Sequence, residues 1–170
     1  MLIYDQAVDP YHTSIRLMAI LRAAEERAVQ LSIDAARIAD YFLVYPSKME
    51  DFTFPAEFRN IRNAVKEIEN PYRNAPGIRA AFERMRPVFV AALSGLIAAQ
   101  FVKDDAFNSG LIHSDASEIP DTFRAAVDRF RARQTVIGKF ILSDLLDMPA
   151  NGDKGLKHRS RLIEYRYDIV

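Results

Sequence analysis

Apolar residues recur at helical spacing through most of the chain, and the stops between these runs are well marked. Asp9 can cap a helix whose first position is Pro10, and the apolar stripe that follows predicts a helix over residues 10–28. A second helix is predicted from the capping residue Ser32 to Pro46, because proline disfavours the helical conformation of the residue before it. The chain is therefore expected to begin with two helices, the first of them buried on more than one side.

Further helices are predicted in the rest of the chain, separated by Pro, Asn and Gly residues. Each carries apolar side chains three or four positions apart. The predicted helices span 55–70, 78–85, 87–102, 120–133 and 134–147, with a connector at 47–54 and a loop at 149–155. The stretch NPYRNAPG, residues 70–77, is the best candidate for an internal hinge because Pro, Asn and Gly are dense in it.

Two segments have the pattern of extended chain. Residues 101–115 look like two short extended pieces around a turn at 108–110. Near the C-terminus, isoleucines and tyrosines alternate with charged residues over 163–169, which is typical of a half-buried strand. Paired helices, an apolar helix and extended pieces around a turn follow the order of a winged-helix core.

We therefore predict a mainly α fold of the α+β type. It is one helical domain over residues 1–170, with a winged-helix-like core and a short C-terminal strand or hairpin. The candidate hinge at 70–77 would separate an N-terminal helical part from the winged-helix-like C-terminal part.

Composition supports a globular protein of the cytoplasm. The 170 residues suit one domain, and 49% hydrophobic with 27% charged residues are ordinary globular values. The absence of cysteine excludes disulfides and thiolate metal sites and favours a reducing compartment. The N-terminus lacks a signal-peptide pattern, and the longest apolar stretch, 87–102, is shorter than the roughly 20 residues that a membrane span needs. No association with a membrane is expected.

No catalytic signature is present in the sequence. None of the three histidines lies in a metal-ligand spacing. His12 could be a base oriented by Asp9, although local capping is the commoner role of such a residue. The run His113–Asp115 contains the residue types of a nucleophilic triad, but consecutive residues of an extended chain point to opposite faces. Phosphate-binding glycine loops are absent, so we expect no enzyme, no cofactor and no metal site.

Most clusters of charge have a simple surface interpretation. The acid pairs Glu25–Glu26 and Asp104–Asp105 are sequence neighbours and are expected to be solvated. Four arginines of the helix at 120–133 are expected to form local ion pairs with two aspartates of the same helix: Arg124, Arg129, Arg131 and Arg133 with Asp121 and Asp128.

The basic cluster near the C-terminus is less compensated by acids. Lys154, Lys157, Arg159 and Arg161 lie in a segment, Gly152–Arg161, that we interpret as a mobile loop. Positive side chains on such a loop can neutralise DNA phosphates without reading sequence, or can contact an acidic protein partner. This pattern leaves both readings open, and docking to a protein is favoured because no groove-reading helix is evident.

Two tyrosines on the predicted terminal strand favour the docking interpretation. Tyr165 and Tyr167 lie on the apolar face of that strand and can pack while each hydroxyl makes a polar contact. A strand at the end of a chain can also add its free edge to the sheet of a partner.

Two motifs in the N-terminal part carry a family resemblance. Tyr4–Leu21 contains Asp-x-x-His-x-x-x-Arg at Asp9, His12 and Arg16, and Asp40–Pro46 is an Asp followed by aromatic and aliphatic residues and a proline. With the C-terminal sequence GLKHRSRLIEYRYDIV, they resemble the small middle components of three-component ABC-ATPase conflict systems in bacteria. That group includes Lamassu-type anti-phage defence.

The resemblance implies a non-enzymatic subunit beside an SMC-like ABC ATPase and an effector, often a nuclease. In such systems the middle component is expected to act as an adaptor, so that DNA sensing controls effector release and duplex DNA is contacted through the complex. It also implies that Asp9, His12 and Arg16 fix the N-terminal segment onto the fold. A free-standing winged-helix DNA-binding regulator is the alternative, and a small hydrolase ranks below both.

Overall fold

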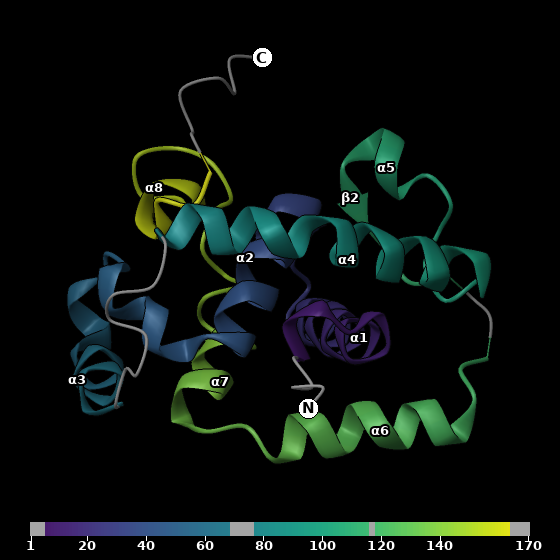
Figure 1. Cartoon of the computed structure of the whole chain (residues 1–170), viewed down its shortest axis with the longest axis horizontal. Coiled ribbons are helices and arrows are strands. Elements are labelled where there is room, and N and C mark those ends of the chain that lie inside the picture. The colour runs from purple at the N-terminus through teal and green to yellow at the C-terminus, as the bar shows by residue number, and fades with distance from the viewer. Residues whose placement is uncertain (1–5, 69–76, 116–117, 164–170) are drawn as a thin grey trace, which may run out of the picture.

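The computed structural model describes residues 6–68, 77–115 and 118–163 and shows a mainly helical fold (Figure 1). The α-helices are α1 (Pro10–Glu26), α2 (Ile33–Val44), α3 (Arg59–Glu67), α4 (Ile78–Ala98), α5 (Ala106–Ser109), α6 (Asp121–Ala132), α7 (Val136–Ile141) and α8 (Leu156–Ser160). Two short strands are β1 (Leu31–Ser32) and β2 (Leu111–Ile112), and 3-10 turns are η1 (Gln6–Val8), η2 (Pro46–Asp51) and η3 (Ala56–Phe58). The predicted mainly helical class is confirmed.

Helix α1 lies at the centre of the fold. Figure 1 shows it end-on, with α4 above it and α6 below, and it also packs against α2. The run from Leu17 to Leu21 is buried on every side. The predicted cap is present, since the Asp9 carboxylate accepts hydrogen bonds from the backbone N–H of Tyr11 at 2.8 Å and of His12 at 3.3 Å. Ser32 likewise caps α2, as the sequence predicts.

The two helices predicted at 78–85 and 87–102 are one continuous helix, α4, with Pro87 inside it. Proline removes one helical hydrogen bond and costs about 3 kcal/mol in a helix interior. The buried face runs straight past this residue, through Phe82, Met85, Phe89, Ala92, Leu93 and Leu96. Each buried large side chain contributes about 1.5–3 kcal/mol, so packing along the whole helix outweighs the local cost.

The extended pieces predicted in 101–115 are present but pair differently from a simple hairpin. Val102 bridges Ser114, while β2 pairs antiparallel with β1, ahead of α2. The turn expected at 108–110 is the short helix α5, which ends at Gly110 with φ +72°. A winged-helix core needs a longer hairpin beside a helix pair, and the residues that the structure describes do not show one.

Other boundaries differ from the prediction where turns replace helix. The predicted helix at 134–147 is confined to α7, followed by turns up to Asp147. The connector at 47–54 holds most of η2, and the helix expected from Pro55 begins as η3. Residues 69–76 and 164–170, which hold nearly all of the candidate hinge and of the predicted terminal strand, lie outside the described residues. Among those described, no helix combines the length and apolarity needed to cross a membrane.

Candidate interaction surface

The described residues contain no cluster that suggests catalysis. Nowhere in 6–68, 77–115 or 118–163 do three His, Asp or Glu side chains come close enough to hold a metal ion. Ser114, the middle residue of the triad-like run, donates from its hydroxyl and from its backbone N–H to Glu25 of α1. The contact between Ser114 and Glu25 therefore attaches the extended chain around Ser114 to α1.

The structure brings together the two motifs that carry the family resemblance. Arg16 of α1 donates from Nε to Oδ1 of Asp40 on α2 at 2.6 Å, and from Nη2 to the Thr13 hydroxyl at 2.8 Å. Thr13 in turn donates to the backbone carbonyl of Asp9 at 2.9 Å. A chain of hydrogen bonds thus runs from the cap of α1 to the middle of α2.

This ion pair is almost wholly buried, with side-chain exposures of 4% for Arg16 and 2% for Asp40. Burial raises the pKa of the Asp40 carboxyl, and the charge and hydrogen bonds of Arg16 oppose that rise. Because a guanidinium does not lose its proton, protonating Asp40 would leave a buried cation without a counter-charge. At neutral pH the pair is therefore ionised, and its geometry is that of a structural clasp between α1 and α2.

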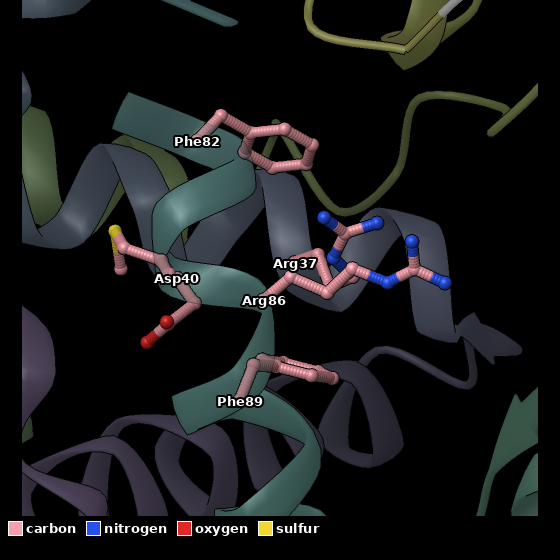
Figure 2. A pocket seen from close by; sticks show the side chains of 6 residues that line it. Arg37, Asp40, Phe82, Arg86 and Phe89 are labelled. Atoms are coloured by element: carbon pink, nitrogen blue, oxygen red, sulfur yellow. The ribbon is translucent and has the colours of Figure 1, made fainter. Parts of the chain in front are cut away.

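A small pocket lies on the other side of Asp40, between α2 and α4. Figure 2 shows the Arg37 and Arg86 side chains pointing to the same side, with the Asp40 carboxylate turned away from them. Arg37 lies 4.4 Å from the centre of the Phe82 ring and 3.1 Å from a Glu83 oxygen. The space open to water centres is about 10 Å³, enough for one water and far below the size of a ligand site.

The basic segment at the C-terminal end is built into the fold instead of forming a mobile loop. Lys157, on α8, is only 5% exposed and its ammonium lies 2.8 Å from Asp34 in the first turn of α2. Arg159 donates to the carbonyl of Thr53 at 2.8 Å, and the Thr53 N–H donates back to the Arg159 carbonyl at 3.0 Å. Two of the four predicted contact residues therefore make internal contacts that fix α8 onto α2 and the connector after η2.

Gly155 allows the tight entry into α8. A Cβ at this position would stand 2.3 Å from the Asn151 carbonyl oxygen, closer than any real contact. Packing therefore requires glycine at this position, although the sequence alone suggests a flexible loop.

The other two predicted contact residues are exposed. Lys154 precedes α8 and Arg161 follows it, and both lie on the surface. The Arg161 carbonyl accepts a hydrogen bond from Nε of Arg79, at the start of α4, at 2.9 Å. We call Lys154, Arg161 and Arg79 the basic end of the molecule. Contact of this end with DNA or an acidic partner stays a prediction, as does docking by Tyr165 and Tyr167, which lie outside the described residues.

The arginines of α6 make two kinds of ion pair. Arg124 pairs with Asp121 within the helix at 3.4 Å, as predicted. Arg131 instead reaches Glu26 of α1 at 2.7 Å, and Asp128 pairs with Arg22 of α1 at the same distance. The expectation that these two pairs are local to α6 is therefore wrong, and Glu26 is exposed, as expected, but also paired with Arg131. Hydrogen bonding to Arg131 lowers the pKa of Glu26.

The sequence profile of the ABC-three component (ABC-3C) system Middle Component 5 family matches residues 2–168. The chain belongs to this family. The resemblance inferred from the two helix motifs and the C-terminal sequence is confirmed. No curated protein and no solved structure matches the chain.

Sequence reasoning missed what Asp40 does in this ABC-3C middle component. The sequence places Asp40 in a helix motif, but its bond to Arg16 joins positions that are 24 residues apart. The sequence does contain a signal for this pair, since Arg16 and Asp40 are each a charged residue within an otherwise apolar run of their helix. His12, the third member of the first motif, is half-buried, and its backbone N–H donates a hydrogen bond to the Asp9 carboxylate.

Proposed function

We propose that this middle component is a non-enzymatic adaptor that links the ATPase of its ABC-3C system to an effector in bacterial defence. The effector is often a nuclease in the systems that the chain resembles. Family membership supports a role beside other components of the same system. The described residues offer interaction surfaces and no clustered chemistry, which fits a linking role better than a catalytic one.

The basic end is the surface that we assign to contact with another component. Lys157 and Arg159 hold α8 in place, so Lys154 and Arg161 extend from a fixed platform beside Arg79. Exposed cations on a rigid element suit electrostatic complementarity with an acidic partner surface, which raises association rates and selects the partner. We infer that the basic end contacts an acidic surface of one of the other two components.

Co-expression of all three components with a tag on this chain tests the proposal. We expect both other components to co-purify, and the double variant Lys154→Glu/Arg161→Glu to weaken retention of one of them by about tenfold, or 1.4 kcal/mol. Arg129→Glu/Arg133→Glu is the matched control, because it reverses two exposed charges at the C-terminal end of α6, away from α8 in Figure 1.

Three results would count against the proposal. Elution of the wild-type chain alone would remove the adaptor role, and equal losses in the test and control variants would remove the basic end as the surface. Salt-dependent binding of the isolated protein to duplex DNA, lost in the test variant alone, would assign these cations to phosphate contact and favour a DNA-binding regulator.

A further inference from the structure

The outer face of α4 is a second surface, distinct from the basic end. From Pro87 to the C-terminal end of the helix it carries no charge, although 27% of the chain is charged. No other labelled element lies in front of it in Figure 1. Its exposed residues from the proline onward are small or apolar: Pro87, Val90, Ala91, Ser94, Gly95, Ala98 and Ala99. The solvent face of a helix usually carries charged side chains, so this face has the composition of a contact.

Gly95 supports a contact independently of this composition. It lies in the interior of α4, where glycine costs about 1 kcal/mol relative to alanine. A Cβ at this position would meet no atom within 4 Å, and no unusual φ demands glycine there. The described fold therefore gives no reason for the glycine. Close approach of a second backbone from outside gives one, because side-chain size at the contact sets how near two helices come.

The charges at the two ends of α4 oppose the preference of the helix itself. Arg84 and Arg86 follow its first turn and are exposed beside Glu83, and the first turn itself holds no acid. Asp104 and Asp105 are exposed just beyond its C-terminal end, after the exposed Lys103. A helix favours acids at its N-terminus and bases at its C-terminus, so the stability of α4 alone does not explain this arrangement.

We propose that α4 packs antiparallel against α4 of a second copy of this chain, about a twofold axis near Ala91 and Gly95. In that arrangement Arg84 and Arg86 of each copy lie near Asp104 and Asp105 of the other copy, and the small residues meet in the middle. Each set of charges also lies near the helix end that favours it, that of the opposite copy. The same surface of each copy therefore carries both the basic and the acidic residues, as a twofold interface requires.

The contact is short. Pro87 to Ala99 spans roughly 18 Å of helix axis, so the interface is at the small end for specific pairs. We therefore expect a dimer with a dissociation constant on the order of micromolar to 100 µM. Because the adaptor proposal rests on the basic end, the two proposals are independent.

Sedimentation velocity on the full chain from about 1 to 500 µM measures this equilibrium. We expect the wild type to pass from monomer to dimer, and Gly95→Leu to remain monomeric with a dissociation constant raised at least tenfold. The open space at Gly95 predicts that this variant folds with unchanged or higher thermal stability. Ala132→Leu, an exposed alanine at the end of α6, is the control and should dimerise normally.

Charge reversal tests the orientation. Arg84→Glu should weaken the dimer, and adding Asp105→Arg in the same chain should restore it, since each residue then meets its opposite in the second copy. A wild type that is monomeric at every concentration, or a Gly95→Leu variant that dimerises like the wild type, overturns the proposal. The proposal also fails if the wild type is monomeric and the Gly95→Leu variant no longer co-purifies with another component of the system, because the outer face of α4 then binds that component.

Discussion

Replacing Asp40 by asparagine should destabilise the protein strongly, because it removes the charge that Arg16 faces in the core. Their side chains are 2% and 4% exposed, and no water layer replaces the lost carboxylate. Removing one partner of a buried ion pair costs about 3–5 kcal/mol. Asparagine can still accept one hydrogen bond and Thr13 still accepts another, so we expect a value near 3 kcal/mol.

Urea unfolding followed by circular dichroism measures this cost. With a slope near 2 kcal/mol per molar, a loss of 3 kcal/mol moves the midpoint down by about 1.5 M at unchanged slope. Arg22→Met is the control: it breaks the exposed pair with Asp128 and should cost about 1 kcal/mol or less.

A double replacement separates the ion pair from the packing around it. Arg16→Met should cost about as much as Asp40→Asn, because it leaves the carboxylate alone. Arg16→Met/Asp40→Leu should return to within about 1 kcal/mol of the wild type, because apolar pairs of similar volume often replace buried ion pairs at little cost. The reasoning is refuted if Asp40→Asn costs less than 1 kcal/mol, or if the double variant is as unstable as the sum of the single ones.

Three further outcomes follow from single side chains. Lys157→Ala should lower the unfolding free energy by about 1–3 kcal/mol and Lys154→Ala by less than 0.5, measured by urea unfolding, since only Lys157 is buried against a carboxylate. Burial raises the pKa of Tyr41, whose hydroxyl has no hydrogen-bond partner among the described residues, so Tyr41→Phe should leave stability unchanged or raise it by about 1 kcal/mol. A loss above 1 kcal/mol would reveal a partner for that hydroxyl. Since Arg131 lowers the pKa of Glu26 from 4.5, their pair stabilises the fold above pH 4.5, and that contribution disappears as the pH falls through the lowered value. Glu26→Gln should therefore cost up to about 1 kcal/mol at pH 7, and this cost should shrink as the pH falls through the lowered pKa of Glu26. A cost that does not change with pH would show that the charge of Glu26 is irrelevant.

Local signals predicted local structure well in this chain. The caps at Asp9 and Ser32 and the stop at Pro46 mark α1 and α2 because each acts through hydrogen bonds or sterics within four residues. The periodicity of 120–133 marks α6 for the same reason. These features made the mainly helical class and the family motifs readable from the sequence.

Features that depend on distant partners were decided only by the tertiary structure. The break predicted at Pro87 does not occur, since the cost of the proline is local while the gain comes from a whole buried face against α1. The segment of Lys157 and Arg159 looks like a mobile basic loop until Asp34 and the Thr53 backbone, more than 100 residues earlier, supply their partners.

The same division holds for the candidate surfaces. Residue types and periodicity show which side chains are basic, which helix is apolar and which motifs place the chain in its family. Packing decides which of those cations reach solvent, that Arg16 pairs with Asp40, and that the described residues leave one side of α4 exposed. The physical reason is that burial and charge pairing belong to the packed whole, whereas capping and periodicity belong to a few adjacent residues.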